Sequence, residues 1–524
     1  MSPNVADLIL KQLADYGIKQ IYGVVGDAIF PLADAFTRQD RIRFIPTTIE
    51  TAASFMASAS AKLTGLPGVC IGTSGPGAAN LANGVADAYM DQAPLLCITG
   101  QVPANKLGTK TKQYIDQSCF FNAITSASRL CIHPEAVSPA LHELLDIAQT
   151  FKTPVHFAVP QDVFSMPVSE ESFRSAPSIA KLNPCTTALD NATSSLQFLH
   201  GTERPLIIAG KIPRTLCEDL HSFANNYGAG IILGQESKGI IPDMDPLVLG
   251  GAGEAYLPDI LAEADLILLF GEAVYEDRFI PEKTKVIQFK SDSGTGSLKH
   301  AQMVADLHLL LKELNGMFPE PCPRTAWRSR IKKAHDARLE TVAQYSAPQH
   351  PANFFRKLSE LIQDDAIVCL DVGEFAYWFD FAFLAQKQQV LLSTNWRSMG
   401  SGIPSGIAAC LDFPGRKVVS VIGDGGFLMS MAELSTVLRY NLPLTIFVMR
   451  NKVYGLEKQK MSKQGLTCVG TDLTLPDLMK IAAAFNMRSY RITDSTGFHM
   501  LKEAIENPPA LVELEDFSAM LPSL

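Results

Sequence analysis

The segment Gly423-Asp424-Gly425-Gly426 stands where a strand-like run, VVSVIG, gives way to a helical stretch. At such a turn, free backbone N–H groups and the helix dipole favour a phosphate group. The segment is not the dinucleotide pattern G-x-G-x-x-G, since Leu428 takes the third glycine's place, and no Lys-Ser/Thr follows as in a Walker loop. Asp424 suits a phosphate site only when a hard cation bridges the two charges, and Mg²⁺ prefers oxygen ligands of this kind. On these four residues alone, a tight turn with a capping Asp is an equal alternative.

Asn451 lies 27 residues after Asp424 and ends the next apolar strand, PLTIFVMRN. Neighbouring parallel strands place their carboxyl ends at one edge of a sheet, where ligands bind. One carboxylate and one amide oxygen from adjacent strand ends therefore predict a divalent-cation site.

Asp424 and Asn451 can lie at one sheet edge only if strands and helices alternate along the chain. The sequence shows three series of such alternating segments. The strand-like runs are IKQIYGVV, VCIG and LLCIT in the first series, PLIIAG, GIILG, LILLFG and VIQF in the second, and AIVCLDVG, VVSVIGDGG, PLTIFVMRN and PALVELED in the third. Polar stretches near 164–190 and at 346–351 separate the series. Alternation of this kind predicts an α/β fold with three doubly wound parallel-sheet domains, at 1–165, 190–330 and 350–524.

The composition of the chain argues against a nucleic-acid-binding protein and a membrane protein. The 524 residues are 47% hydrophobic and 19% charged, with a formal charge of −9 and no run of basic residues, so a nucleic-acid partner is not expected. No apolar stretch reaches the length of a membrane helix and no signal peptide opens the chain, so we expect a cytoplasmic protein without a membrane partner. The 10 cysteines are scattered without C-x-x-C spacing, which predicts reduced core residues.

The GDG turn followed 27 residues later by Asn resembles the diphosphate motif of thiamine-diphosphate enzymes. Segments in all three thirds of the chain are similar to the pyruvate oxidase, acetohydroxyacid synthase and 2-oxoacid decarboxylase superfamily. The resemblance implies two cofactor-binding domains flanking a central, nucleotide-binding-like domain. It also implies that Asp424, the side chain of Asn451 and the backbone carbonyl of Val453 hold Mg²⁺.

The same resemblance implies further cofactor contacts. Asp371-Val372-Gly373 resembles the family's second diphosphate turn. The backbone of Arg397 would accept the cofactor's amino group beside Ser398, and Met399 would wedge under the cofactor and bend it. The remaining expected cofactor contacts are Gly425, Gly426, Tyr454, Gly455 and Leu456.

Glu50 follows the strand-like FIPTTI and precedes a helix of small residues. Taken alone, a Glu at a helix start is more often a cap or a dipole partner. In the family, this position carries the glutamate that hydrogen-bonds the aminopyrimidine ring and so generates the ylid, an electron sink. Ser74-Gly75-Pro76-Gly77 resembles a family loop that reaches the cofactor, with Asn80 near the reacting carbon, although two glycines and a proline also make a plain tight turn.

The family's active sites combine the first domain of one subunit with the last domain of another, which implies a homodimer or homotetramer. In the expected substrate pocket, Asp27 and Glu457 match acids of the decarboxylases, where Glu457 would protonate the enamine. Gln113 matches a glutamine of oxidases and synthases.

Two positions depart from the family. Lys112 replaces a Phe, and Lys460 replaces the Trp by which acetohydroxyacid synthases select their second oxo acid. The departures suggest that both lysines face the substrate and bind a second anionic group. The paired histidines of pyruvate decarboxylases are absent from the loop that contains Lys112.

The middle third of the chain retains the general sequence pattern of the family's central domain but lacks the motifs that are associated with flavin binding. Gly250-Gly251-Ala252-Gly253 lacks the following His-Gly-Thr, and Gln288-Phe289-Lys290-Ser291 replaces an Asp-rich strand end, although Arg278 ends a VYEDR segment as in the family. We therefore expect no functional FAD.

The sequence predicts an enzyme that uses thiamine diphosphate and Mg²⁺ to decarboxylate a pyruvate-like 2-oxo acid. The enamine is then either protonated or joined to a second carbonyl. The alternatives are an acetolactate synthase-like carboligase, an FAD-linked pyruvate oxidase, or a non-catalytic regulatory relative. The presence of Glu50, Asp424 and Asn451 argues against the last of these.

Overall fold

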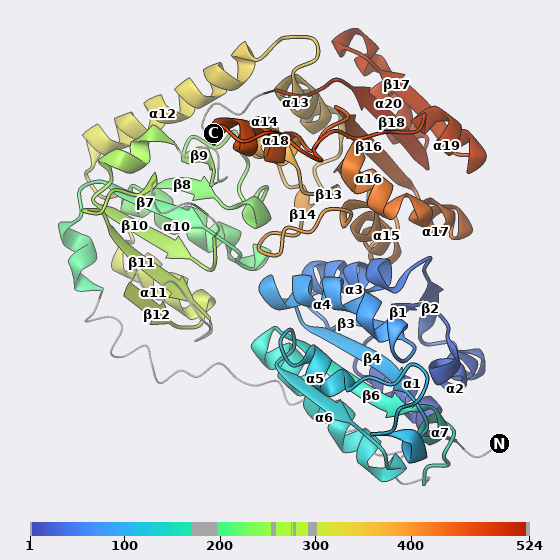
Figure 1. Ribbon diagram of the computed structural model, residues 1–524. Helices are drawn as coiled ribbons and strands as arrows, with labels where there is room; N and C mark the ends of the chain where they lie inside the picture. The colour runs from blue at the N-terminus through green and yellow to red at the C-terminus, as the bar shows by residue number, and fades with distance from the viewer. Residues whose placement is uncertain are drawn as a thin grey trace. The chain divides into compact units, whose positions relative to one another are not determined.

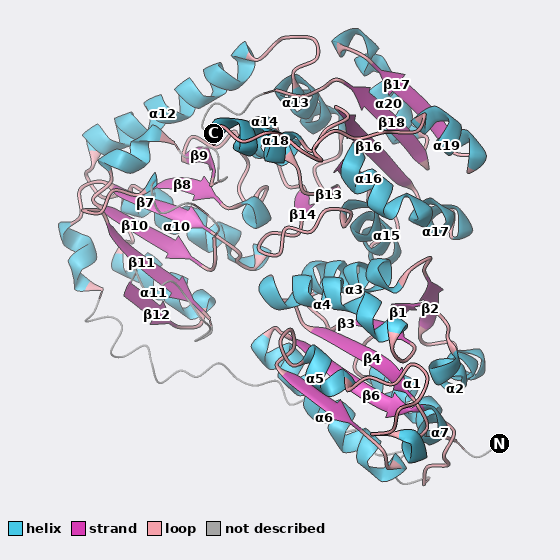
Figure 2. Ribbon diagram, viewed as in Figure 1, coloured by secondary structure: helices cyan, strands magenta, loops and turns pink. Residues whose placement is uncertain are grey.

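The computed structural model describes residues 3–169, 196–252, 258–273, 275, 279–291 and 301–519. Strands and helices alternate along most of this length, and the strands form three parallel sheets of six strands each (Figure 1, Figure 2). The predicted α/β class is confirmed. Among the described residues, no helix combines the length and apolarity that a membrane crossing requires.

The first sheet has the order β2-β1-β3-β4-β6-β5. Its strands are β1 Gln20–Gly23, β2 Arg43–Pro46, β3 Gly68–Gly72, β4 Leu95–Gln101, β5 Ala127–Leu130 and β6 Pro154–Pro160. The helices that flank it include α1 Val5–Asp15, α3 Glu50–Thr64, α4 Pro76–Met90 and α6 Pro134–Phe151. Helices α3 and α4 pack closely because Gly84 faces Ser54, where a Cβ would overlap the Ser54 backbone.

The second sheet has the order β12-β11-β10-β7-β8-β9. Its strands are β7 Pro205–Ala209, β8 Gly230–Leu233, β9 Val248–Gly251, β10 Leu266–Phe270, β11 Lys285–Lys290 and β12 Ala301–Val304. Helices α10 Cys217–Tyr227, α11 Leu307–Met317 and α12 Thr325–Gln344 follow in the same part of the chain. Of the flavin-associated residues, Gly253 and Arg278 lie outside the described residues.

The third sheet has the order β14-β13-β15-β16-β18-β17. Its strands are β13 Ile367–Leu370, β14 Gln389–Leu391, β15 Val418–Gly423, β16 Leu444–Arg450, β17 Arg488–Ile492 and β18 Ala510–Glu515. Its helices are α13 Pro351–Leu361, α14 Glu374–Ala382, α15 Gly402–Asp412, α16 Asp424–Ser430, α17 Leu434–Arg439, α18 Gly455–Lys463, α19 Leu478–Ala484 and α20 His499–Glu506. As predicted, β15 and β16 are neighbours, so Asp424 and Asn451 follow adjacent strand ends.

The chain packs into two compact units. The first contains residues 1–181, 395–420 and 426–444, and the second contains 182–394, 421–425 and 445–524. Within the first unit, α15 packs against α3 (Figure 1). Each of the three predicted domains contains one sheet, and the bounds of those domains stay a prediction.

The cysteine prediction is partly wrong. None of the nine cysteines in the described residues forms a disulfide, and Cys70, Cys97, Cys131, Cys369 and Cys410 are buried as predicted. Cys119 is exposed, and Cys217, Cys322 and Cys468 are partly exposed, because they lie on helix surfaces and loops rather than in buried strands.

Candidate active site

Glu50 is the first residue of α3, directly after the loop that leaves β2. Its side chain is buried, with 8% of the residue exposed, and its Oε2 accepts a hydrogen bond of 3.0 Å from Asn80 Nδ2. No side chain caps this helix start, where the helix dipole favours a carboxylate. A buried acid whose hydrogen-bond partner among the described residues is Asn80 is thus placed at the carboxyl edge of the first sheet.

The loop after β3, Thr73-Ser74-Gly75, leads into α4, whose first residues contact Glu50 through Gly77 and Asn80. A Cβ on Gly77 would lie 2.9 Å from Thr73 Cγ2 and 3.1 Å from Glu50 Oε1, so a larger residue would press on both side chains. Gly75 has a φ of +65°, and a Cβ there would lie 2.8 Å from the backbone oxygen of Gln113. These glycines are therefore needed for close approach to Glu50 and Gln113 as well as for the turn.

The loop also contacts Asp27. The exposed Asp27 follows β1, and its Oδ1 accepts hydrogen bonds from Ala28 N at 2.9 Å and from Thr73 Oγ1 at 3.2 Å. Gln113 is half-buried with a φ of +64°, and its neighbour Lys112 is exposed. This loop and the start of α4 thus gather Asp27, Glu50 and Gln113 at the same sheet edge.

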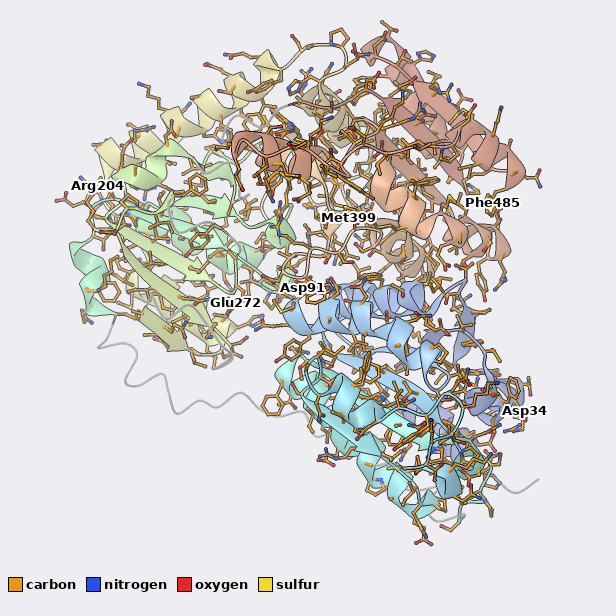
Figure 3. All side chains as sticks on the ribbon, viewed as in Figure 1. Asp34, Asp91, Arg204, Glu272, Met399 and Phe485 are labelled. Carbon is orange, nitrogen blue, oxygen red and sulfur yellow. The ribbon has the colours of Figure 1, made fainter. Side chains whose placement is uncertain are left out.

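The segment Asn395–Met399 is held by α4 in the first unit. Asp91, the residue after α4, accepts hydrogen bonds from the backbone N and the Nδ2 of Asn395 at 2.7 and 3.1 Å. Asn83 Oδ1 accepts a hydrogen bond from Trp396 Nε1 at 2.7 Å, and Asn83 Nδ2 donates to Ser398 Oγ at 3.2 Å. Figure 3 labels Asp91 and Met399 on these two segments.

Within this segment, Arg397 has a φ of +55°, and Arg397, Ser398 and Met399 are each half-buried. The left-handed conformation at a non-glycine residue turns the chain just before α15 begins at Gly402. The predicted wedge, Met399, is therefore fixed at a constrained turn.

Asp424 begins α16 in the turn after β15 and is 3% exposed. Its Oδ2 accepts hydrogen bonds from the backbone N–H groups of Asn451 at 3.0 Å and Lys452 at 2.6 Å, and its Oδ1 accepts one from Gly425 at 2.8 Å. Burial raises the pKa of this carboxyl group, and the backbone N–H donors partly oppose the shift. The Asp424 carboxylate therefore links the ends of β15 and β16 through hydrogen bonds.

Asn451 is oriented by a residue that sequence analysis missed, Glu374. Asn451 Nδ2 donates to Glu374 Oε1 at 3.0 Å, and Gln459 Nε2 donates to Glu374 Oε2 at 2.9 Å. A Cβ on Gly455 would overlap the Glu374 carboxylate. Burial raises the pKa of Glu374 to about 7, and the charge of Asp424 adds to the shift while the Asn451 hydrogen bond opposes it.

The only signal for Glu374 in the sequence was its position directly after the predicted turn Asp371-Val372-Gly373. Asp371 is buried in that turn, and its backbone N donates to Val421 O at 2.8 Å. Val372 and Gly373 are half-buried. The turn therefore lies beside β15, which leads to Asp424.

The loop after β16 carries the remaining predicted contacts. Val453, Tyr454, Gly455 and Leu456 are half-buried, and Tyr454 packs over Gly425, where a Cβ would overlap its ring. Glu457 and Lys460 lie on the exposed face of α18, with 3.7 Å between Lys460 Nζ and Glu457 Oε1. Lys460 therefore already has an anionic neighbour on its own helix.

The donor set suits a hard cation bound to a diphosphate. The predicted ligands are one carboxylate, one amide oxygen and one carbonyl oxygen, the oxygen donors that Mg²⁺ prefers. Asn451 Oδ1 accepts only a 3.2 Å hydrogen bond, from Val453 N, among the described residues, so a lone pair is left for a cation. No group of three His, Cys, Asp or Glu side chains suited to a metal occurs in the described ranges, which excludes a competing cluster only there.

Comparisons with known proteins agree across the chain. Three family models match: the thiamine pyrophosphate enzyme N-terminal TPP binding domain over residues 3–120, the central domain over 193–314, and the C-terminal TPP binding domain over 371–514. A Bacillus subtilis protein named YdaP and described as thiamine pyrophosphate-containing is 29% identical, covering 92% of this chain and 86% of its own.

Acetolactate synthases are similar over the same extent. The Escherichia coli isozyme 1 large subunit is 29% identical, covering 97% of this chain and 93% of its own. The chloroplastic acetolactate synthase 1 of Oryza sativa is 28% identical, covering 99% and 86%. Three domain models match, the strands form three parallel sheets, and Asp424 and Asn451 follow adjacent strand ends. This chain therefore belongs to the thiamine-diphosphate-dependent enzymes of the pyruvate oxidase, acetohydroxyacid synthase and 2-oxoacid decarboxylase superfamily.

Proposed function

We propose that this enzyme decarboxylates a pyruvate-like 2-oxo acid and joins the remaining fragment to a second carbonyl compound, with Mg²⁺ as the second cofactor. The observation that carries the proposal is the buried carboxylate of Glu50, held by Asn80 at the edge of the first sheet. A burial cost of this kind is retained where the acid has a chemical task.

Different residues are assigned to the cation, to the diphosphate and to the rest of the cofactor. Asp424, the Asn451 amide oxygen and the Val453 carbonyl would hold the cation, while Asp371, Val372, Gly373, Gly425, Gly426 and the backbone of Tyr454–Leu456 would contact the diphosphate. Arg397, Ser398 and Met399 would contact the rest of the cofactor. Thiamine diphosphate, when bound, supplies the electron sink that loss of CO₂ requires. Glu50 holds the proton exchanged with the aminopyrimidine ring, and Asn80 keeps its carboxylate in place.

Ligation is favoured over protonation because relatives that span nearly the whole chain are named acetolactate synthases. Gln113 and Asp27 line the substrate side in this proposal. Simple protonation is the second candidate, since the carboxylate of Glu457 lies in the first turn of α18, next to the predicted cofactor loop. An FAD-linked oxidase remains a weaker alternative.

Substrate selection is proposed to involve Lys112 and Lys460, which would bind a second anionic group of the substrate. Both side chains are exposed, and Lys460 Nζ also lies 3.7 Å from Glu457 Oε1, a neighbour with which a bound anion would compete. Changing each to Ala should then shift the preference between pyruvate and a dianionic oxo acid toward pyruvate. An unchanged preference in the double variant contradicts this role.

We also propose that the enzyme is a cytoplasmic homodimer or homotetramer with active sites between subunits. Equilibrium sedimentation of the purified chain with and without thiamine diphosphate and Mg²⁺ tests the assembly. A monomer that turns over substrate contradicts it.

The reaction is tested by measuring CO₂ release from a panel of 2-oxo acids with thiamine diphosphate and Mg²⁺ present. Product analysis then separates ligation, which yields a 2-hydroxy-2-alkyl-3-oxo acid or a related ketol, from protonation, which yields an aldehyde. Glu50→Gln should lower CO₂ release by about 10²-fold or more. Activity that survives this change would falsify the assigned mechanism.

A further inference from the structure

Helices α3 and α4 pack side by side in the first unit along a polar stripe (Figure 1). On α3 the stripe repeats every fourth residue, which is the spacing of one helix face, and consists of Glu50, Ser54, Ser58 and Lys62. On α4 and directly after it, the facing residues are Asn80, Gly84, Asp87 and Asp91. The stripe is buried apart from its ends, so it lies between the helices and is not a solvated surface.

The end of the stripe far from Glu50 is a buried ionic cluster. Ser58 Oγ donates to Asp87 Oδ2 at 2.6 Å, and Lys62 Nζ donates to the same oxygen at 2.8 Å. Lys62 Nζ also donates to Asp91 Oδ2 at 2.6 Å. The side chain of Asp91 is 0% exposed, so these contacts fix its rotation. With Oδ2 on Lys62, Asp91 directs Oδ1 to the segment Asn395–Met399.

That segment is fastened to α4 at two points. Asp91 Oδ1 accepts from the backbone N and from Nδ2 of Asn395, at 2.7 and 3.1 Å. Asn83, two turns earlier on α4, accepts from Trp396 Nε1 at 2.7 Å and donates to Ser398 Oγ at 3.2 Å. The two fastenings lie on either side of Arg397.

The fastened segment contains a strained turn near the surface. Arg397 has a φ of +55°, which is a left-handed conformation at a residue with a side chain. Asn395 and Trp396 are exposed, and Arg397 and Met399 are half-buried. A conformation of this kind persists only where the surroundings impose it. Hydrogen bonds from a buried, rigid helix pair provide such a constraint.

We propose that Asp91 and Asn83 are positioning residues for the cofactor, because they hold the turn that presents Met399, and that Lys62 orients Asp91 for this task. The proposal rests on the proposed function, in which Met399 contacts the cofactor. The cation and the diphosphate are assigned to other residues, among them Asp424. Loss of the fastening should therefore disturb the geometry of the bound cofactor more than its affinity.

The variant Asn395→Asp tests the proposal, since Asn395 is exposed and the change sets a second carboxylate against Asp91 Oδ1 in place of a donor. CO₂ release should fall by about tenfold or more, while the Kd of thiamine diphosphate with Mg²⁺, measured by calorimetry, should change by less than about threefold. The near-ultraviolet circular dichroism of the bound cofactor, which depends on how its two rings face each other, should change as well. Asn225→Asp, at an exposed position of α10 in the second unit, is the matched control and should alter none of these measurements.

Trp396 reports on the fastening without any cofactor. It is 42% exposed, whereas the other two tryptophans, Trp327 and Trp378, are 5% and 3% exposed, so acrylamide quenching of tryptophan fluorescence measures mainly Trp396. Asn395→Asp should raise the quenching constant, by at most about twofold, because full exposure is the limit.

The double variant Asp91→Asn with Asn395→Asp separates a specific contact from general damage. Asn at 91 can keep its oxygen on Lys62 and donate its amide to Asp at 395, so CO₂ release should be at least about threefold higher than in Asn395→Asp alone.

Unchanged CO₂ release in Asn395→Asp overturns the proposal. So does a joint loss of CO₂ release and cofactor affinity that the double variant leaves unrepaired, since general damage gives that pattern. If the parent chain releases no CO₂ from any 2-oxo acid, the proposed function fails instead. The dichroism of the bound cofactor then decides the positioning role, and an unchanged spectrum in Asn395→Asp overturns it.

Discussion

Glu374 and Asn451 are 77 residues apart in the chain, yet the Asn451 amide donates a 3.0 Å hydrogen bond to the Glu374 carboxylate. An amide has one donor end and one acceptor end. With its nitrogen held by Glu374, Asn451 presents its oxygen on the other side, where the cation is expected. Glu374 is thus a positioning residue for the metal ligand.

Replacing Glu374 by Ala should therefore weaken Mg²⁺ binding by about 10- to 100-fold, as loss of an outer partner of a metal ligand does. Glu374→Gln keeps one acceptor oxygen for Asn451 but loses the acceptor for Gln459, so it should retain more Mg²⁺ affinity than Glu374→Ala. Titration with Mg²⁺ in the presence of thiamine diphosphate measures both. Equal affinity in Glu374→Ala and the parent chain contradicts the positioning role.

Gly77→Ala should reduce CO₂ release by about tenfold or more, because the added Cβ would lie 3.1 Å from Glu50 Oε1 and 2.9 Å from Thr73 Cγ2. A carboxylate shifted by a few tenths of an ångström would be less well aligned with the cofactor ring. Gly316→Ala is the matched control, since nothing lies within 4 Å of a Cβ at that helical position. Full activity in Gly77→Ala would show that Glu50 needs no such space.

His156 should make stability depend on pH. Burial lowers its pKa to about 3, and its ring lies between Thr99 Oγ1 and Ser128 Oγ, each 2.8 Å away. The native ring stays neutral while the unfolded chain takes up a proton below about pH 6.5. The free energy of unfolding should therefore fall as pH falls from about 6.5 toward 3, by about 1.4 kcal/mol per pH unit from this group.

Urea unfolding at pH 7, 6 and 5 measures the effect of His156. Other groups also titrate, so the contribution is taken as the difference from His156→Gln, which should be less stable at pH 7 but should lack this part of the slope. Identical slopes in the two proteins would rule out a buried neutral histidine.

Lys62 should be essential for the packing of α3 on α4. Its Nζ lies 2.8 Å from Asp87 and 2.6 Å from Asp91, and the exposed fractions of the three side chains are 6%, 3% and 0%. Burial alone would lower the pKa of Lys62, but the two carboxylates raise it above its ordinary value. Lys62→Met leaves two buried acids without their cation and should cost about 3–5 kcal/mol in the free energy of unfolding.

Lys332→Met removes an exposed ion pair with Asp336 and should cost about 0.5 kcal/mol or less. Denaturant unfolding of the two variants gives the comparison. A similar small loss in both would mean that the buried triad adds no more than a surface pair.

The purified protein should lack the absorption spectrum of FAD. The end of β11 carries Gln288 and Lys290, both buried, where family members have an Asp-rich nucleotide contact. The spectrum of the protein before and after denaturation, which releases any bound flavin, measures this directly. A yellow protein that releases FAD would overturn the expectation.

The sequence alone determined the α/β class and most buried strands. Runs such as LLCIT and PLTIFVMRN are apolar because strands in the middle of a parallel sheet are covered on both faces. Strands β5, β6, β9, β12, β14 and β17 were not predicted. Of these, β5, β12 and β17 lie at sheet edges and are mostly partly exposed or exposed, whereas β6 and β9 are buried and were missed all the same. Partial exposure removes the apolar run on which sequence analysis depends.

The sequence also determined the turn after β15 and the Asn that follows β16, because a parallel sheet brings neighbouring carboxyl ends together. It could not show what surrounds each side chain. Only the tertiary structure brought Glu374 to Asn451, Gly77 to Glu50, and Asp412 to Gln20. Local pattern fixes which residues end a strand or begin a helix, whereas contacts between residues distant in the chain depend on how helices pack across the sheets.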